Sequence, residues 1–174
     1  MGAAGAPSSA RSTSSRADPL EASRPARHED VARLAELARG MRAELRAVRG
    51  GAIWAEREAL AEPLDDAYAA LLDRDDACVV VGTIDEVVIG FAALLIDVLH
   101  DGARLAVITD LFVEEGARSV GVGEAMITEL VTFASRAGCI GVDALALPGA
   151  RAAKNFFEES GFTARIIVMH RPAG

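Results

Sequence analysis

The sequence from Leu105 to Gly138, LAVITDLFVEEGARSVGVGEAMITELVTFASRAG, has the pattern of a strand, a loop and a helix. Residues 105–113 are mostly apolar and partly β-branched, which is typical of a largely buried strand. From Glu124 onward, apolar side chains recur at the period of a helix, at Ile127, Leu130, Val131 and Ala134. Gly138 stands where helices often end on a glycine. This stretch therefore predicts a buried strand joined to a helix by a glycine-containing loop.

The loop between that strand and that helix, Arg118–Gly123, has the composition of an anion-binding turn. Two glycines two residues apart, Gly121 and Gly123, let the backbone approach a bulky ligand because no Cβ intervenes. A helix that begins here directs its free N–H groups and the positive end of its dipole into the loop. Arg118 adds a permanent charge and a planar set of donors that suits phosphate oxygens. The loop therefore predicts a site for a pyrophosphate group.

Three types of phosphate loop compete for this stretch. The P-loop requires Gly-Lys-Ser/Thr at its end, and the only lysine of the chain, Lys154, lies elsewhere. The dinucleotide loop G-x-G-x-x-G requires a third glycine where this chain has Met126. The first glycine of a dinucleotide loop also follows its strand closely, whereas Gly121 is separated from Val113 by seven residues. The pattern R/Q-x-x-G-x-G/A fits Arg118–Gly123, so we favour this third type.

With this loop and its flanking segments, the chain resembles the GNAT acyltransferases, the N-acetyltransferase superfamily that uses acetyl-CoA. Leu111-Phe112-Val113 matches the apolar end of the family's fourth strand, at the usual distance before the arginine. Residues 153–162, AKNFFEESGF, resemble the family's closing A-x-x-F-Y-E-x-x-G-F helix and turn. The resemblance covers residues 28–174 and is sharpest from Leu105 onward.

The resemblance implies a mixed α/β (α+β) fold, the GNAT acyl-CoA N-acyltransferase fold, whose central and mostly antiparallel mixed sheet is flanked by about four helices. It also implies that acetyl-CoA is the acyl donor, that the fourth and fifth strands splay to admit its pantetheine arm, and that an amine attacks the thioester directly. Carried over residue by residue, the cofactor-binding positions are Leu111, Phe112, Val113, Arg118, Ser119, Val120, Gly121, Val122, Gly123 and Phe157.

The catalytic side chains of the family are not all present in this chain. The tyrosine that often serves as acid is Phe157 here, an asparagine position holds Ala150, and a glutamate position holds Leu145. Asp110, a carboxylate inside an apolar strand, is the first candidate for a catalytic base, because burial there would raise its pKa. Asp143 on the following strand is the second candidate. The alternative for both is a surface or capping aspartate without a catalytic role.

Outside this region, the sequence predicts one domain over residues 28–174 behind a disordered tail over residues 1–27, which is rich in Ala, Ser, Gly, Pro and Arg. Apolar periodicity and glycine or proline breaks predict the order helix, helix, three antiparallel strands, helix, strand, helix, strand. Trp54 is assigned to a loop after Gly50-Gly51, and the final strand to residues 164–170. The helical connection after the central strand makes that strand and the next one parallel.

Composition sets further expectations. The net charge of −8 argues against a nucleic-acid partner. The chain has no apolar run near 18 residues and no signal-peptide pattern, so we expect no membrane association and a cytoplasmic location. Cys78 and Cys139 do not have the spacing of metal ligands, so we expect no metal.

The acceptor and the activity itself remain open at this level. Acidic side chains between Glu56 and Asp76 would attract a cation, which favours a primary amine on a small cationic molecule or on a protein lysine or N-terminus. A second subunit is a candidate for the far wall of the acceptor site, which would make the protein a homodimer. The alternatives are a catalytically idle acyl-CoA-binding or regulatory module that lost the tyrosine at Phe157, and a nucleotide-phosphate binder outside the family.

Overall fold

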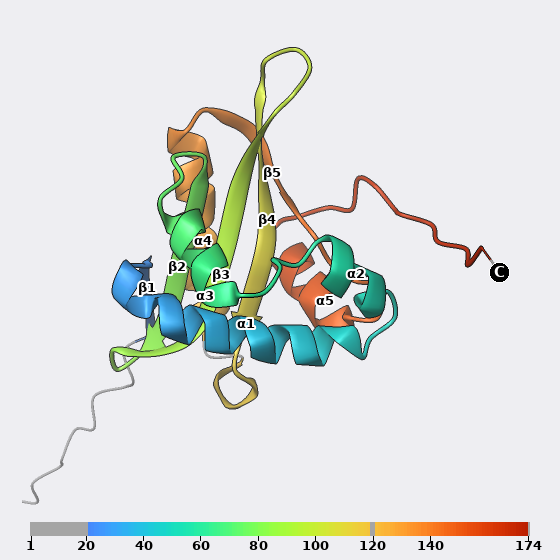
Figure 1. Cartoon of the computed structure of the whole chain (residues 1–174). Helices are drawn as coiled ribbons and strands as arrows, with labels where there is room; N and C mark the ends of the chain where they lie inside the picture. Colours follow the sequence, from blue (N-terminus) through green and yellow to red (C-terminus); the bar gives the residue numbers. More distant parts are fainter. Residues whose placement is uncertain (1–20, 119–120, 174) are drawn as a thin grey trace, which may run out of the picture.

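The computed structural model of the chain describes residues 21–118 and 121–173. Its elements are labelled in Figure 1, and their order is β1 (Glu21–Pro25), a 3-10 turn (His28–Asp30), α1 (Val31–Arg46), α2 (Gly51–Arg57), α3 (Leu64–Leu72), β2 (Ala77–Ile84), β3 (Val87–Val98), β4 (Arg104–Val113), a second 3-10 turn (Glu115–Ala117), α4 (Val122–Arg136), β5 (Cys139–Ala144) and α5 (Arg151–Glu159). Within these ranges, no helix combines the length and the apolarity needed to cross a membrane.

The five strands form one mixed sheet in the order β1-β2-β3-β4-β5. Neighbouring strands are antiparallel except β4 and β5, which are parallel. Helix α4 makes the crossover between these two strands, as the sequence predicts, because parallel neighbours cannot be joined by a tight turn. The predicted fold class, a mostly antiparallel mixed sheet with helices, is therefore confirmed.

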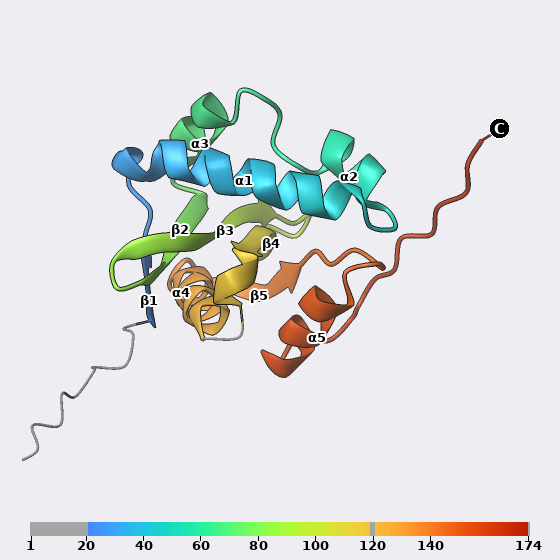
Figure 2. The ribbon, with the colours of Figure 1, turned by 90° about the horizontal axis from the view of Figure 1, so that it is seen from below.

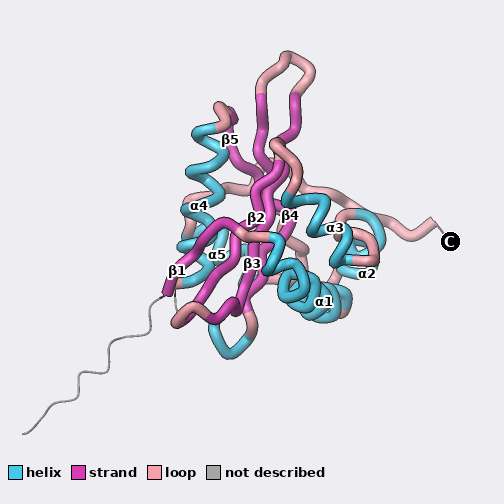
Figure 3. Tube along the Cα trace, turned by 60° about the vertical axis from the view of Figure 1, so that its left-hand side comes forward, coloured by secondary structure: helices cyan, strands magenta, loops and turns pink. Residues whose placement is uncertain are grey.

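Helices cover both faces of the sheet. Helices α1, α2 and α3 lie on one face and α4 lies on the other, and the edge-on view in Figure 3 separates the two helical layers. In β3, Phe91 and Ala93 point to the α1–α3 side, whereas Ala92 and Leu94 point to the α4 side. All four are fully buried, which explains why the central strand reads as a continuous apolar run rather than an alternating one.

A glycine in β2 lets the first turn of α4 lie directly on the sheet. A Cβ at Gly82 would be 2.3 Å from Cγ1 of Val122 and 3.0 Å from the sulfur of Met126. No side chain tolerates a contact of 2.3 Å, so only glycine allows this approach. This contact fixes the distance between the N-terminus of α4 and the sheet, beside the end of β4.

The predicted disordered tail is too long at its C-terminal end. Residues Glu21–Pro25 form strand β1, which pairs with β2, so the ordered domain begins before residue 28. The segment EASRP has no apolar run, so its local sequence does not favour a strand. Tertiary contacts hold it in place. Ser23 Oγ donates a hydrogen bond to the carbonyl of Ala125 in α4, and Arg24 forms an ion pair with Asp30. Residues 1–20 lie outside the described part of the chain.

The predicted loop around Trp54 is a helix. Helix α1 ends at Arg46, and Gly50, with φ +89°, is the N-cap residue of α2, which brings the number of α-helices in the described ranges to five. A Cβ at Gly51 would lie 1.7 Å from the carbonyl oxygen of Leu45, so the second glycine allows α2 to start directly against the end of α1. Trp54 is buried in the core between these helices and the sheet.

The predicted final strand over residues 164–170 is not formed. After α5 the chain has no regular structure, and it extends away from the body of the molecule (Figure 1). β5 is also shorter than predicted, ending at Ala144, and its register with β4 shifts after Cys139. An apolar segment becomes a strand only where another strand offers it hydrogen bonds, and the sequence pattern does not reveal whether one is available.

Candidate active site

Strand β4 extends beyond the end of β5, and this difference opens the sheet. The parallel pairing ends at Ile108 and Ala144, whereas β4 continues to Val113 and stays paired with β3 over that whole length. From Thr109 to Val113, β4 therefore has one paired edge and one edge without a strand partner. The free N–H and C=O groups of such an edge are ready to bind an extended ligand that carries amides. The predicted cofactor-binding residues Leu111, Phe112 and Val113 all lie on this segment and are half-buried.

The N-terminus of α4 follows the free edge of β4 in the sequence. Gly121 is the N-cap residue and has φ +82°, a left-handed conformation that favours glycine. Helix α4 has 15 residues, so its first turn carries the free N–H groups and the dipole end that the anion site needs. Val122 is buried against the sheet and orients this turn. Ser119 and Val120, also predicted to bind the cofactor, lie outside the described residues.

Gly123 has a structural role that the sequence analysis did not foresee. A Cβ at this position would lie 3.1 Å from Cζ and 3.2 Å from Cε2 of Phe156 in α5. A side chain here would require the ring of Phe156 to shift by a few tenths of an ångström. The glycine therefore eases the packing of α5 against the start of α4.

Arg118 is directed toward α1. Its guanidinium donates to both carboxylate oxygens of Glu44, over 3.1 and 2.6 Å, and its Nε donates to the carbonyl of Val113 over 2.8 Å. The guanidinium carbon also lies 5.5 Å from the centre of the Phe112 ring. The side chain thus joins the loop after β4 to α1, and a phosphate would have to compete with Glu44 for it.

A bulge in β4 decides where Asp110 points. Ala93 of β3 pairs with Asp110, but Leu94 pairs with Ile108, so Thr109 is an extra residue on β4. Before this bulge, Ile108 faces α4; after it, Asp110 faces the opposite side of the sheet, toward α1 and α3. Regular alternation would have placed Asp110 on the same face as Ile108, because side chains two residues apart share a face of a strand. The bulge therefore moves a carboxylate from one core to the other.

The carboxyl group of Asp110 is buried and has few polar neighbours. It is 5% exposed, and the hydroxyl of Thr109 donates a hydrogen bond to Oδ2 over 2.7 Å. Burial raises the pKa of Asp110 to about 6, and the Thr109 hydrogen bond partly opposes this shift. Burial also raises the pKa of Tyr68, with the charge of Asp110 adding to the effect, so the Tyr68 phenol keeps its proton. The pair thus combines a carboxylate that titrates near neutrality with a protonated phenol.

A small cavity lies in front of Asp110. Its walls come from α1, α2, α3 and the loop between the last two, and they comprise Ala38, Met41, Arg42, Trp54, Ala59, Leu60, Leu64, Tyr68 and Asp110. Its volume is about 10 Å³, which is about the space that one water molecule occupies. A larger acceptor can enter only if the loop between α2 and α3 moves.

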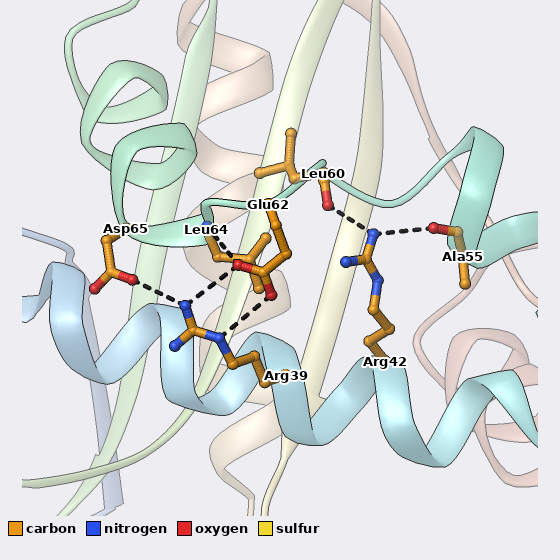
Figure 4. Close-up of polar contacts among 7 residues, drawn as sticks. All are labelled: Arg39, Arg42, Ala55, Leu60, Glu62, Leu64 and Asp65. Carbon is orange, nitrogen blue, oxygen red and sulfur yellow. Dashed lines mark hydrogen bonds and ion pairs between the residues drawn. The ribbon is translucent and has the colours of Figure 1, made fainter.

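Two arginines of α1 hold that loop. Arg42 donates through Nη2 to the carbonyls of Ala55 and Leu60, each over 2.9 Å, and so bridges the end of α2 to the loop (Figure 4). Arg39, one turn earlier, forms ion pairs with Glu62 and Asp65 at the start of α3. The Arg39 pairs are exposed, whereas the Arg42 hydrogen bonds to the two carbonyls are partly buried. Together they fix the loop between α2 and α3 over the cavity.

A larger and more open groove lies on the same side of the sheet, where α1 passes the end of β4. It has a volume of about 500 Å³ and is lined by Arg33, Glu36, Leu37, Gly40, Glu44, Phe112, Glu114 and Glu115. Three of its four glutamates are in ion pairs, Glu36 and Glu114 with Arg33 and Glu44 with Arg118. The groove therefore keeps a small excess of negative charge, and the half-buried Phe112 packs against the same core as the cavity walls.

Asp143, the second candidate for a catalytic base, forms an ion pair away from the Asp110 cavity. Asp143 pairs with Val107 in the parallel ladder, and its carboxylate forms a bidentate ion pair with Arg165 from the C-terminal segment. The cavity around Asp110 does not include Asp143 among its walls. The structure therefore does not bring the two predicted carboxylates into one cavity.

Phe157 lies on the α4 side of the sheet. It is 6% exposed and packs edge-on against the rings of Phe156 and Phe162, with ring centres 5.8 and 5.3 Å apart. It belongs to the same core as Leu111 and Val113. Without a hydroxyl, this side chain has no proton to donate, so its contribution to the site is apolar packing.

The acidic cluster between Glu56 and Asp76 is mostly neutralised by ion pairs. Its paired members are Glu56 with Arg46, Glu58 with Arg57, Glu62 and Asp65 with Arg39, Asp73 with His28, and Asp76 with Arg74. The attraction that the sequence predicts for a cation is therefore weaker at this cluster than a charge count suggests. The glutamates of the groove beside the end of β4 are likewise partly neutralised, by Arg33 and Arg118.

Three residues with a role in the site escaped the sequence analysis. Glu44 is 74 positions from its partner Arg118, and Arg42 was assigned only to the end of an amphipathic helix. Thr109 looks like an interruption of an apolar strand, and nothing in the sequence marks it as a bulge. Among the described residues, no group of three or more His, Cys, Asp or Glu side chains is placed to hold a metal ion.

Comparisons with known proteins agree with this geometry. The sequence model of the acetyltransferase (GNAT) family matches residues 44–162. Among curated protein sequences, none matches the chain significantly.

Several solved structures share the fold. A putative acetyltransferase from Agrobacterium tumefaciens is 20% identical with a TM-score of 0.67, over 87% of this chain and 99% of the other. The aminoglycoside N-acetyltransferase AAC(6')-Iy, solved with CoA, is 18% identical with a TM-score of 0.68, over 91% and 99% of the two chains. An aminoglycoside acetyltransferase from an uncultured soil metagenomic sample, solved with sisomicin, is 20% identical with a TM-score of 0.67, over 88% and 95%.

Proposed function

The chain belongs to the acetyltransferase (GNAT) family, and we propose on this basis that it is an N-acetyltransferase that transfers an acetyl group from acetyl-CoA to a primary amine. The observation that supports the proposal best is the combination at β4. One edge of this strand is free beside a glycine-capped helix N-terminus, and a buried carboxylate, Asp110, lies on the strand near the beginning of that free edge. Such a combination provides a place for an acyl donor and a group that can take a proton from an amine.

On the donor side, the residues present suit acetyl-CoA. The free edge of β4 from Thr109 to Val113 would hydrogen-bond the amides of the pantetheine arm, and the first turn of α4 would bind the pyrophosphate through its backbone N–H groups. Leu111 and Val113 supply an apolar lining on the α4 side. Bound acetyl-CoA would supply the activated thioester that acylates the amine.

On the acceptor side, Asp110 is the proposed base. The amine nitrogen attacks the thioester carbon, the carbon–sulfur bond breaks, and CoA leaves as a thiolate that takes up a proton. An amine enters as an ammonium ion at neutral pH, and Asp110 with a pKa near 6 is ionised and able to accept its proton. Tyr68 lines the same cavity and keeps its proton, so it is the candidate donor of a hydrogen bond to the acceptor, and the thiolate takes its proton from solvent.

We propose a cationic acceptor, either a small molecule with several amino groups or a protein lysine or N-terminus. The groove beside the end of β4 supports this, because its four glutamates outnumber the two arginines that pair with them, Arg33 and Arg118, and the remaining negative charge attracts cations. Two of the structures that share the fold are named as aminoglycoside acetyltransferases, which are enzymes with polycationic acceptors. Their identity to this chain is at most 20%, so the acceptor class is part of the proposal.

A second candidate, a catalytically idle acyl-CoA-binding module, is favoured by one observation. The cavity at Asp110 holds about 10 Å³, and Phe157 packs in the core where the family often has its acid. In an idle module the loop between α2 and α3 would stay closed over the cavity. The two candidates differ in whether an amine ever reaches Asp110.

Release of the CoA thiol from acetyl-CoA separates these candidates. We expect release that depends on an added amine when the protein is tested against diamines, polyamines, aminoglycosides and a lysine-containing peptide. Acetyl-CoA binding measured by calorimetry, without release on any member of the panel, would favour the idle module. No binding of acetyl-CoA at all would refute both.

A further inference from the structure

The cavity in front of Asp110 is small, and its walls are mostly apolar. Its volume of about 10 Å³ corresponds to the space of one water molecule. Among the described residues that line it, Asp110 has the only negative charge and Arg42 the only positive one. The other lining residues are alanines, leucines, a methionine, a tryptophan and a tyrosine. This lining suits a small cationic group that is attached to an apolar stem.

Among the described residues, no cation forms an ion pair with Asp110. Its carboxylate is buried and accepts a hydrogen bond from the neutral hydroxyl of Thr109. Arg42 donates through Nη2 to the carbonyls of Ala55 and Leu60 instead, and Figure 4 shows its side chain directed to these two residues. A buried carboxylate without a counter-ion attracts an ammonium group strongly, because little solvent screens the two charges.

Most of the cavity wall belongs to the packed core. Helices α1, α2 and α3, which lie together on one face of the sheet (Figure 2), supply the lining residues Ala38, Trp54, Leu64 and Tyr68, and these are 1 to 6% exposed. The Tyr68 ring also packs edge-on against Phe91 of β3, with ring centres 5.5 Å apart. Displacing such close-packed side chains is costly. A movement of the loop between α2 and α3 can therefore admit an acceptor, while the helices set the width of the space at Asp110.

Proton transfer to Asp110 fixes the position of the reacting nitrogen. The nitrogen must come within hydrogen-bond distance of the carboxylate, about 2.6–3.2 Å. An ammonium group is similar in size to a water molecule, so the nitrogen fills the free space in front of Asp110. The carbon bonded to this nitrogen then lies against the cavity walls. A methylene carbon continues in one direction only, whereas a branched carbon needs room for two substituents.

We propose that this site selects amino groups carried on a methylene carbon, and that Leu60 and Leu64 are specificity-determining residues because they narrow the cavity at that carbon. The inference rests on the proposed acetyl transfer and narrows its acceptor. Linear diamines, polyamines and the lysine ε-amine belong to the selected class. The α-amino group of an amino acid or of a protein N-terminus other than glycine, and an amine on a ring carbon, do not.

The selection acts on the same reaction that was proposed above. The ammonium group gives one proton to Asp110 and a second to solvent, the new nitrogen–carbon bond forms as the carbon–sulfur bond breaks, and the CoA thiolate takes one proton from solvent. Branching changes neither the charge of the amine nor this chemistry, so it changes only the fit at the cavity wall.

Two matched diamines test the proposal. Putrescine carries both amino groups on methylene carbons, and its α,α′-dimethyl derivative has the same spacing and charge with one methyl group added beside each nitrogen. We expect kcat/KM for release of the CoA thiol to be at least tenfold higher for putrescine, the lower end of what one extra carbon changes in an apolar pocket. A ratio below tenfold, with acetyl transfer intact, would overturn the proposal.

Failure of the acetyl transfer itself gives a different result. If no amine of the panel releases CoA, the proposed function is wrong and this inference falls with it. If other amines react and neither diamine does, mass spectrometry of the acetylated lysine-containing peptide, or of whichever acceptor reacts, identifies the modified nitrogen. Acetylation on a methylene-bound nitrogen is expected, and preferential acetylation on a branched carbon would contradict the selectivity.

Widening the cavity should abolish the preference. Leu64→Ala should bring the ratio between the two diamines below about threefold, because the lost side chain leaves room for a methyl group. Leu71→Ala is the matched control: it truncates another buried leucine of α3 in the same core that does not line the cavity, and the ratio should stay above about tenfold. Leu60→Ala, at a half-buried position of the loop, widens the cavity without cutting into the core. An unchanged ratio in the folded Leu60→Ala variant and in Leu64→Ala would show that these walls do not select the acceptor.

Discussion

At the scale of single residues, burial disfavours the ionised form of Asp110. It is 5% exposed, and its pKa rises from 3.8 to about 6 because the buried site disfavours the ionised form. Between these two pH values the folded protein holds a proton that the unfolded chain has released, so the free energy of unfolding falls as pH rises through this window. Above about pH 6 the cost of the buried charge is fully present.

Asp110→Asn should therefore stabilise the protein at pH 7. The shift of the pKa corresponds to about 3 kcal/mol, and asparagine still accepts the hydrogen bond from Thr109, so we expect a gain of about 2–3 kcal/mol. Urea unfolding at pH 7 and pH 4 checks this, and the gain should shrink at the lower pH. Asp143→Asn, in a partly exposed ion pair, is the control and should not stabilise. Destabilisation by Asp110→Asn at pH 7 would contradict the account of this site.

The ion pair between Arg118 and Glu44 gives a second prediction at this scale. If a phosphate of acetyl-CoA takes Arg118 from Glu44, then Glu44→Gln removes the competitor. It should tighten acetyl-CoA binding by up to about fivefold, as expected for an exposed pair worth at most ~1 kcal/mol. Arg118→Ala should weaken binding by about 1.5–3 kcal/mol. Calorimetric titration measures both, and Glu56→Gln, which breaks an exposed pair elsewhere, is the control.

The double substitution decides the interpretation of that pair. Glu44→Gln should have no effect once Arg118 is alanine, because its only role in binding would be to compete for the guanidinium. If instead Glu44→Gln weakens binding as much as Arg118→Ala does, the pair only supports the loop and Arg118 does not contact the phosphate.

At the scale of elements, the sequence predicts best where local pattern and tertiary environment agree. The strand, loop and helix from β4 to α4 are evident because β4 is a long apolar run, α4 is amphipathic, and Gly121 has the φ of +82° that a glycine favours. The arrangement of this unit could be predicted for the same reason, and the binding of acetyl-CoA to it stays a prediction. The bulge at Thr109 was not, because it is defined by the register with β3 and not by residue type.

At the two ends of the chain, local sequence pattern and tertiary environment disagree. β1 has no apolar pattern and exists because β2 and α4 provide partners for it. The C-terminal run has a strong strand pattern and forms no strand, because its own sheet does not pair with it. Strand formation depends on a partner that the local sequence does not encode.

The connection between β1 and α1 gives a prediction at this scale. Arg24 donates to both carboxylate oxygens of Asp30 over 2.7 and 2.8 Å, and the N–H of Arg27 donates to the same carboxylate over 2.8 Å. Asp30→Asn should lower the free energy of unfolding at pH 7 by about 1.5–3 kcal/mol, the range for hydrogen bonds to a charged group. Asp76→Asn, which breaks an exposed pair with Arg74, should change it by less than ~1 kcal/mol.

Acid should abolish the difference between Asp30→Asn and the natural chain. The hydrogen bonds from Arg24 hold the pKa of Asp30 below its ordinary value, so its stabilising effect is present above the unfolded pKa and is lost as pH falls through the lowered folded pKa. Urea unfolding from pH 7 to pH 3 measures this. A difference that stays constant over the whole range would mean that the cost of the substitution comes from packing and not from charge.

At the scale of the whole molecule, the net charge of −8 and the acidic groove beside β4 favour a cationic acceptor. We expect kcat/KM to be higher for a diamine than for an amino acid of matched length, because the carboxylate of the amino acid is repelled. The advantage should decline from low to high salt, since added ions screen charges separated by more than ~8–10 Å. A preference for the amino acid, or a diamine rate that does not respond to salt, would exclude electrostatic selection of the acceptor.

The pH dependence of kcat/KM for acetyl transfer to an amine is the most direct test of the proposal that the bulge in β4 presents a catalytic base. For the natural chain we predict an acid limb with an apparent pKa near 6, the value at which Asp110 ionises. For Asp110→Asn we predict a rate lower by ~10²–10⁴-fold and the loss of this limb. Equal rates with the same acid limb in both proteins would contradict the account, because the proton would then go to another group.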